Sequence, residues 1–154
     1  MSTITEMARS HYEKGVPYEI AEPETSLYQV LEETARFYPN RPATQYFGQE
    51  LTYSQLKTEV DRAANVLRLA GVRRGDAVSI ALPNCPQHVI VFYALMRIGA
   101  IAAEHNPLAP ISEIEQQIKR HRGKVAVVWE KSVSKFAFGP GHQLQTVFTV
   151  DITR

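Results

Sequence analysis

Two polar groups follow apolar stretches of the sequence in positions where they could do chemistry. Glu104 and His105 stand directly before Asn106-Pro107, and an adjacent acid and base could transfer a proton or bind a metal ion. Asn84 and His88 follow an earlier apolar stretch. In a parallel sheet, ligands bind beyond the carboxyl ends of the strands. The candidate pocket residues at this edge are Asn84, His88, His105 and Asn106.

The first interpretation of these residues is structural. Asn and Pro are what a turn requires, because Asn hydrogen-bonds its own backbone and the residue before proline is held extended. No nucleophile or second base accompanies His105. We therefore interpret His105 first as a hydrogen-bonded structural histidine, second as the wall of a ligand pocket and only third as catalytic. No catalytic residue is predicted.

The sequence predicts no metal site. The five histidines are dispersed, and no two of them are four residues apart on a helix. His88 and His105 could approach each other, but two ligands do not make a site. The single cysteine, Cys85, is expected to be a buried free thiol, which fits a reducing compartment.

None of the glycine-containing loops matches a nucleotide phosphate loop. Gly71 and Gly75 are four positions apart, but no Gly-Lys-Ser or Gly-Lys-Thr follows them. Gly123-Lys124 is followed by Val125 instead of a hydroxyl residue, and the stretch 139–141 has no third glycine. No cofactor-binding residue is predicted, and a nicotinamide-dependent oxidoreductase is disfavoured.

Composition and charge narrow the classes of partner. The 154 residues suffice for one domain, and a net charge of +1 gives no general attraction to nucleic acid or acidic lipid. The basic stretch KRHRGK, 119–124, is interpreted as the solvated end of a helix, where cations complement the dipole. The longest apolar run, 89–103, is shorter than the roughly 20 residues of a membrane span. The amino terminus lacks the apolar core of a signal peptide, so a cytoplasmic location is expected.

Four helices are predicted from cap residues that are followed three positions later by Gln or Glu. These pairs are Ser26 with Gln29, Thr52 with Gln55, Asn84 with Gln87, and Ser112 with Glu115. Pro39 is expected to end the first helix, and Gly71, Gly99 and Gly123 are expected to supply the left-handed residue that closes the others. The apolar face of the second helix is predicted to consist of Leu56, Val60, Ala63, Leu67 and Ala70.

Four short apolar runs between the helices predict buried parallel strands. The runs are 77–82, 100–103, 124–129 and 146–150. Their alternation with helices predicts an α/β fold, a mostly parallel βαβ sheet with flanking helices. A hairpin turned at Gly48-Gln49 is expected before the sheet. Residues 1–25 show no clear period and are interpreted as an extended N-terminal arm.

Two segments of the chain resemble core motifs of a known family. LTYSQL, 51–56, and LMRIGAIAAEHNPLAP, 95–110, are similar to the first two core motifs of the AMP-forming acyl-CoA synthetases, within the acyl-adenylate-forming superfamily. The stretch 71–94 between them is also typical of the family. The EHNP sequence most resembles the long-chain-fatty-acid CoA ligases. It differs from the small or hydroxyl residues that many relatives place before Asn-Pro, and it is less similar to peptide-synthetase adenylation domains.

This resemblance implies a two-step reaction in the complete enzyme. A fatty acid carboxylate attacks the α-phosphate of magnesium ATP to give an acyl-adenylate, and the thiol of coenzyme A then displaces AMP. The family's phosphate loop, magnesium-binding glutamate and catalytic lysine have no matching motifs here. The resemblance therefore implies that residues 26–154 form part of the family's N-terminal, AMP-binding domain, inactive alone, and that ATP, Mg²⁺ and coenzyme A belong to the complete enzyme.

Alternatives remain open at this point. The same half fold could serve as a non-catalytic binding or dimerisation module, or the chain could belong to an aryl- or amino-acid-adenylating relative. A partial sheet would leave an edge and apolar surface open, which favours a homodimer or strand exchange. A peripheral membrane contact fits long-chain substrates, although no basic amphipathic helix argues for one.

Overall fold

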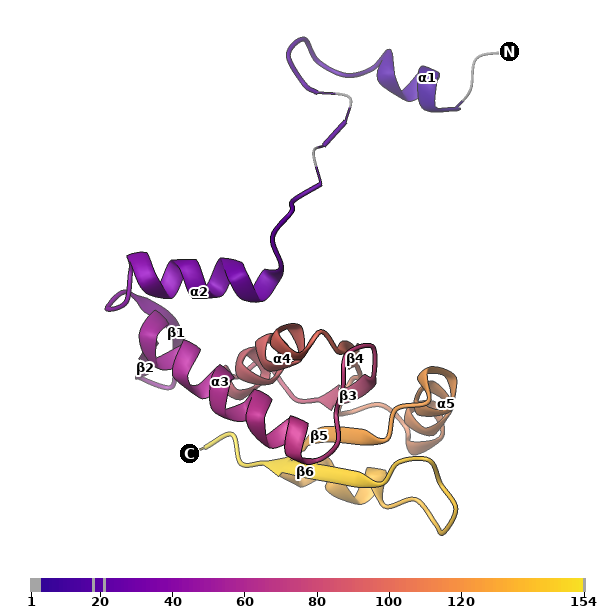
Figure 1. Cartoon of the computed structure of the whole chain (residues 1–154). Helices are drawn as coiled ribbons and strands as arrows, with labels where there is room; N and C mark the ends of the chain where they lie inside the picture. Colours follow the sequence, from indigo (N-terminus) through magenta and orange to yellow (C-terminus); the bar gives the residue numbers. More distant parts are fainter. Residues whose placement is uncertain (1–3, 18, 21, 154) are drawn as a thin grey trace.

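The computed structural model describes residues 4–17, 19, 20 and 22–153, and of Ile4 and Thr5 it describes the backbone alone. Figure 1 shows a parallel sheet with helices on both faces, preceded by a separate hairpin. In chain order, the elements are α1 (Ile4–Arg9), α2 (Leu27–Phe37), β1 (Pro42–Tyr46), β2 (Gln49–Thr52), α3 (Tyr53–Leu69), β3 (Ala77–Ala81), α4 (Pro86–Ile98), β4 (Ile101–Glu104), α5 (Ile111–His121), β5 (Val125–Trp129), the 3₁₀ helix η1 (Glu130–Phe136) and β6 (Thr146–Val150). The predicted α/β class is confirmed.

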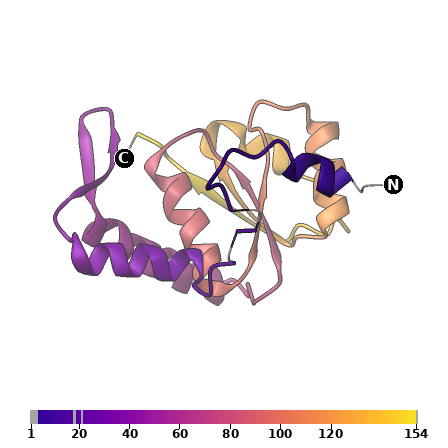
Figure 2. The ribbon, with the colours of Figure 1, turned by 90° about the horizontal axis from the view of Figure 1, so that it is seen from above.

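The sheet has the order β4-β3-β5-β6, and all three pairings are parallel. The chain leaves β3 through α4 to reach β4 on one side, and leaves β4 through α5 to reach β5 on the other side. Right-handed crossovers in opposite directions place their helices on opposite faces of the sheet. Accordingly α3 and α4 pack together on one face, and α5 packs with η1 on the other (Figure 2).

Each face of the sheet has its own apolar core. The larger cluster lies under α3 and α4 and is centred on Val60, Ile80 and Leu95, none of which is exposed. The smaller cluster lies under α5 and η1 and includes Ile114 and Val128. Strands buried on both faces explain why the four runs are almost continuously apolar. On α3, the buried face is Leu56, Val60, Ala64 and Leu67, so Ala64 takes the place predicted for Ala63.

Two of the predicted capping boxes, those at Ser26 and Thr52, are confirmed. Ser26 accepts the amide of Gln29 at the start of α2, and Thr52 accepts the amide of Gln55 at the start of α3. The two other predicted starts are wrong by one or two residues. α4 begins at Pro86 after Cys85, and α5 begins after Pro110, without a side-chain cap in either case. Pro86 is the first residue of α4, where its fixed φ suits a helix. Pro110 is the N-cap of α5, and its extended ψ of 146° lies outside the helix.

The predicted helix ends are partly confirmed. Gly99 is left-handed, with φ 78°, at the end of α4, and Gly71, with φ 94°, follows α3. The prediction for α5 is wrong, because Arg122 takes the left-handed conformation, with φ 58°, and Gly123 does not. Glycine is instead needed at position 123 for steric reasons, because a Cβ atom there would lie 2.6 Å from the carbonyl oxygen of Ala77.

Smaller corrections concern the strands, the hairpin and the arm. The strand predicted at 146–150 is confirmed. The strands predicted at 77–82 and 124–129 are each one residue shorter, and the one predicted at 100–103 is shifted by one residue, to 101–104. The hairpin turns at Phe47-Gly48, both with positive φ, and not at Gly48-Gln49. Positive φ at both turn positions matches the right-handed twist of the two strands. The arm, 1–25, is not extended throughout, because it contains α1, and the sequence reading also missed η1.

Candidate functional site

The carboxyl ends of β3 and β4 lie at the same edge of the sheet, and the predicted site residue His88 contacts Glu104 there. His88, in the first turn of α4, places its Nε2 atom 3.0 Å from both carboxylate oxygens of Glu104. Glu104 is the last residue of β4, so this ion pair joins the helix to the end of the strand. The pair is partly exposed, with 27% of the His88 side chain and 46% of the Glu104 side chain accessible.

His105 points to the opposite face of the sheet from Glu104. Its Nδ1 atom lies 2.7 Å from Oε1 of Gln117 on α5, and its Nε2 atom lies 3.1 Å from the hydroxyl of Ser79 on β3. The residue is 7% exposed. The structure therefore does not bring His88 and His105 together, and the first interpretation of His105, a hydrogen-bonded structural histidine, describes its contacts.

Asn106 builds the turn after β4. Its side-chain oxygen accepts the amide of Leu108 at 2.9 Å, and its carbonyl accepts the amide of Ala109 at 3.0 Å. Lys135 of η1 also binds this loop, because its Nζ atom donates hydrogen bonds to the carbonyl oxygens of Pro107 and Ala109. The side chain of Asn106 is thus engaged by its own loop, as the turn interpretation predicts.

Asn84 lines a cavity of about 380 Å³ between the hairpin and the start of α4. The cavity is lined by Thr44, Gln45, Tyr46, Asn84, Cys85, Pro86, His88 and Val89. Asn84 and His88 therefore line the same cavity, whereas His105 and Asn106 do not contribute to it. The Cys85 thiol is buried and free, and its burial raises its pKa, although the backbone amides of His88 and Gln87 act in the opposite direction. A raised thiol pKa argues against Cys85 as a nucleophile.

A wider groove of about 830 Å³ adjoins this region and lies between the hairpin and the start of α4. Its wall is mainly apolar and includes Tyr46, Phe47 and Ile90, and the C-terminal residues Ile152 and Thr153 contribute to it. The hairpin residues of both cavities were missed by the sequence reading. Their sequence, ATQYF, predicts a strand but carries no sign that the strand faces α4.

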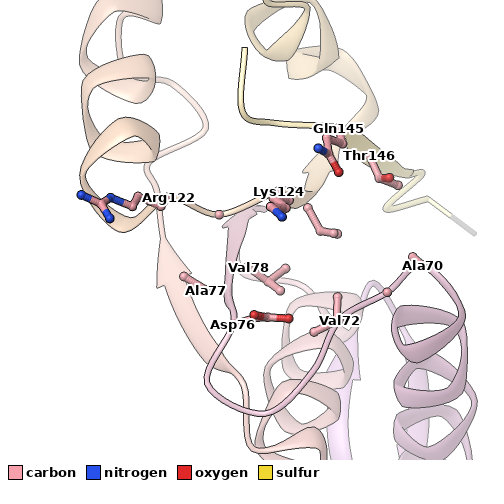
Figure 3. Close-up of a pocket in the computed structure, with 12 residues that line it drawn as sticks. Ala70, Val72, Asp76, Ala77, Val78, Arg122, Lys124, Gln145 and Thr146 are labelled. Atoms are coloured by element: carbon pink, nitrogen blue, oxygen red, sulfur yellow. The ribbon is translucent and has the colours of Figure 1, made fainter. Parts of the chain in front are cut away.

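A third cavity, of about 260 Å³, lies at the amino ends of β3, β5 and β6 and is lined in part by Gly71 and Gly123 (Figure 3). Lys124 and Asp76 line it, while the guanidinium of Arg122 points away from it. The carboxyl ends of α3 and α5 border this cavity, and their carbonyl groups carry partial negative charge. The surroundings therefore do not suit a phosphate.

Two further findings on the described residues concern metal binding and membrane insertion. Among them, no three His, Cys, Asp or Glu side chains are placed to hold a metal ion. None of the helices in the described part of the chain is long and apolar enough to cross a membrane.

A match to a protein-family model shows to which family the chain belongs. The model of a family described as AMP-binding enzyme matches residues 31–152. The chain belongs to the AMP-binding enzyme family. The match covers both sequence motifs and the whole four-stranded sheet, and it confirms the resemblance to the adenylate-forming ligases.

Two curated members of the AMP-binding family illustrate the relationship. A long-chain-fatty-acid–CoA ligase of Bacillus subtilis is 33% identical over 110 residues, which are 71% of this chain and 20% of the relative. A long-chain-fatty-acid–CoA ligase of Yersinia pestis is 33% identical over 139 residues, which are 88% of this chain and 23% of the relative. The chain thus spans about a fifth of the length of these relatives.

Solved structures of the AMP-binding family have the same fold. The crystal structure of the anthranilate CoA ligase AuaEII in complex with anthranoyl-AMP matches with a TM-score of 0.77 and 23% sequence identity. The match covers 82% of this chain and 25% of that one. The sheet and its helices are therefore part of the N-terminal domain fold of adenylate-forming ligases.

We expect the Glu104→Gln variant to lose less than about 1 kcal/mol of unfolding free energy, because exposed ion pairs contribute little. The Nε2 atom of His88 lies 3.0 Å from both carboxylate oxygens, and the variant weakens this contact. Urea unfolding measures the change. Glu50→Gln, at an exposed position of β2, is the control and should change the unfolding free energy by less than about 0.5 kcal/mol. A loss of more than about 2 kcal/mol in Glu104→Gln would contradict a weak, partly exposed contact.

Proposed function

We propose that this chain contributes the first part of the adenylating domain of a long-chain-fatty-acid–CoA ligase. The observation that carries the proposal is the family match over residues 31–152 together with two relatives of that name at 33% identity. The EHNP sequence at 104–107, which most resembles the long-chain branch, supports the same substrate class. In this proposal the complete enzyme joins a long-chain fatty acid to coenzyme A and converts ATP to AMP and pyrophosphate.

In this proposal the residues described here provide scaffold and pocket wall, not catalytic groups. The reaction places negative charge on phosphate, which oriented amides and cations must stabilise. The cavity that Gly71 and Gly123 line lies at the amino edge of the sheet and is bordered by helix carboxyl ends. These residues do not fit ATP. We therefore assign ATP, Mg²⁺ and coenzyme A to parts of the complete enzyme outside them.

The first test is ATP–pyrophosphate exchange by the purified 154-residue chain. With palmitate as substrate, we expect no exchange above the rate without fatty acid, because no described residue is placed to stabilise the charge on the phosphates. The positive control is the Bacillus subtilis long-chain ligase at equal concentration. Exchange by the 154-residue chain that depends on palmitate would refute the scaffold role.

The substrate class needs a separate experiment on the protein encoded by the whole reading frame that contains these residues. Formation of the CoA thioester should be fastest with palmitate and slower with acetate, 4-coumarate or anthranilate. Preference for an aryl acid or acetate would retain the family but reject the long-chain assignment.

A second candidate property is self-association, supported by the edges of the sheet. In the described part of the chain, β4 and β6 each pair with one strand, and Ile101 on β4 is 55% exposed. An open edge strand with an exposed apolar residue is a template for pairing with another chain. Light scattering of the 154-residue chain should therefore give a mass that rises toward a dimer with concentration. A constant monomer mass would reject this property.

A further inference from the structure

Three polar side chains meet between the sheet and α5, on the face that carries the smaller core. Nε2 of His105 lies 3.3 Å from Nε2 of His121, and the hydroxyl oxygen of Ser79 lies 3.1 Å from the first atom and 3.2 Å from the second. Ser79 is fully buried and His105 is 7% exposed. These distances are hydrogen-bond distances, so the protons must be arranged to fit.

The surrounding hydrogen bonds fix that arrangement. The amide of Gly123 donates to Nδ1 of His121 at 3.0 Å, so neutral His121 carries its proton on Nε2. The amide nitrogen of Gln117 donates to Glu113, which leaves the oxygen of Gln117 to accept from Nδ1 of His105. Neutral His105 therefore has a lone pair on Nε2, and the hydroxyl of Ser79 can donate to it while accepting from Nε2 of His121.

An added proton breaks this arrangement on either histidine. A proton on Nε2 of His105 would face the Nε2–H group of His121 at 3.3 Å and would remove the acceptor that Ser79 uses. A proton on Nδ1 of His121 would face the amide of Gly123. Burial lowers the pKa of His121, and the neighbouring His105 acts in the same direction.

The cluster is joined directly to the loop that follows β4. The amide of His105 donates to the carbonyl of Ile80 at 2.8 Å, and the loop 106–110 begins at the next residue. A second side chain, that of Lys135 on η1, donates to the carbonyl oxygens of Pro107 and Ala109 in this loop. The loop thus has one uncharged anchor on α5 and one cationic anchor on η1.

The charged groups around the cluster do not favour its protonated form. On α5, Glu113 binds the cluster only through Gln117, and Glu115 pairs with Lys119 at 2.7 Å. On the same side Lys135 adds a positive charge, as do the exposed Arg122 and Lys124. β5 contributes uncharged Ala126 and Val128 to this face, and the His88–Glu104 pair lies on the other.

We propose that Ser79, His105 and His121 form an acid-sensitive clasp that holds residues 105–110 on α5 and releases them when either histidine is protonated. The clasp controls the position of the loop that follows β4. This inference does not depend on the substrate of the complete enzyme.

The direction of the pH effect follows from the burial of His121. Its pKa in the fold lies below the ordinary value of 6.5, so the folded state binds fewer protons than the released state near that pH. The clasp is therefore fully formed above about pH 6.5 and loosens as the pH falls below it. A single proton changes the opening equilibrium by at most about tenfold per pH unit.

Nuclear magnetic resonance on the 154-residue chain tests the arrangement without any mutation. At about pH 7.5, where an ordinary histidine is mostly neutral, the ring nitrogens should report an Nδ1–H tautomer for His105 and an Nε2–H tautomer for His121. The opposite tautomer on either ring, or a charged His121 at this pH, would overturn the proposal.

Hydrogen exchange tests the release. Between about pH 7 and pH 5.5, protection of the His105 and Ala109 amides, corrected for the intrinsic rate, should fall by up to tenfold per pH unit relative to the amide of Ile80. The double variant His105→Gln/His121→Gln should lose this pH dependence, whereas His11→Gln, in the exposed arm, should keep it. Protection that does not change with pH in the wild-type chain would overturn the clasp, whether or not the double variant folds.

Discussion

The Gly123→Ala variant is expected to unfold with a free energy roughly 1–3 kcal/mol smaller than that of the wild-type chain. A Cβ atom at this position would lie 2.6 Å from the carbonyl oxygen of Ala77 and 2.8 Å from the ring of His121. The carbonyl belongs to the first residue of β3, whose neighbour Val78 pairs with Val125, so the backbone cannot withdraw without disturbing the sheet. Urea unfolding measures the change.

Two other glycines provide matched controls. Gly139→Ala meets open space at an ordinary φ and should change the unfolding free energy by less than about 0.5 kcal/mol. Gly71→Ala also meets open space but has φ +94°, so it should cost about 1 kcal/mol through backbone strain alone. If Gly123→Ala were no less stable than Gly139→Ala, close packing at Gly123 would be the wrong explanation.

Gly123 also shows why the sequence predicts where α5 ends but not which residue there is left-handed. A glycine after a helix usually provides the left-handed residue, so the pattern placed the end of α5 within one residue. The left-handed residue is Arg122, because Gly123 is committed to the close approach to β3. That approach is a tertiary contact between residues 77 and 123, which are far apart in the sequence. A local sequence pattern cannot predict such a contact.

Of the four predicted helix starts, two are likewise correct and two are wrong by one or two residues. Ser26 and Thr52 could be identified because a capping box is satisfied within four residues. Asn84 and Ser112 have the same spacing, but α4 begins at Pro86, whose fixed φ suits a first helical residue, and α5 begins after Pro110. The general order of strands and helices was predictable because periodicity and burial act along each element, whereas boundaries depend on one or two residues.

The candidate site could be predicted only in part. The pattern placed Asn84 and His88 at the carboxyl edge, where they share a cavity. Because side chains alternate along a strand, Glu104 and His105 must point to opposite faces. Their partners, His88 and His121, depend on which face each crossover helix covers, and that follows from the strand order. His121 lies within the basic stretch 119–124, whose composition predicts a solvated helix end. The contact of His121 with His105 could therefore not be predicted from this stretch.

A second large loss of stability is expected for Asp61→Ala, at the junction of α2, α3 and α4. Oδ1 of Asp61 accepts the hydroxyl of Tyr28 at 2.8 Å, and Oδ2 lies 2.8 Å from Nζ of Lys57. Nε of Arg97, on α4, lies 3.2 Å from Oδ1, and its guanidinium lies over the ring of Tyr28. One carboxylate therefore joins three helices.

Removing this carboxylate should cost about 2 kcal/mol, because it leaves a hydroxyl and two cations without their shared acceptor. Burial acts to raise the pKa of Asp61, but hydrogen bonds from Lys57 and Tyr28 outweigh it and hold the pKa below its usual value of 3.8. The contribution of Asp61 is therefore present above about pH 4 and is lost as the pH falls further.

Urea unfolding of Asp61→Ala and wild type at about pH 7 and about pH 3 tests both statements, because the difference between the two proteins should shrink at the lower pH. Glu59→Gln is the matched control. It removes an exposed ion pair with Arg62 on the same helix and should change the unfolding free energy by less than about 0.5 kcal/mol. A loss in Asp61→Ala no greater than in Glu59→Gln would mean that apolar contacts alone, such as those of Leu31, hold α2 on the domain.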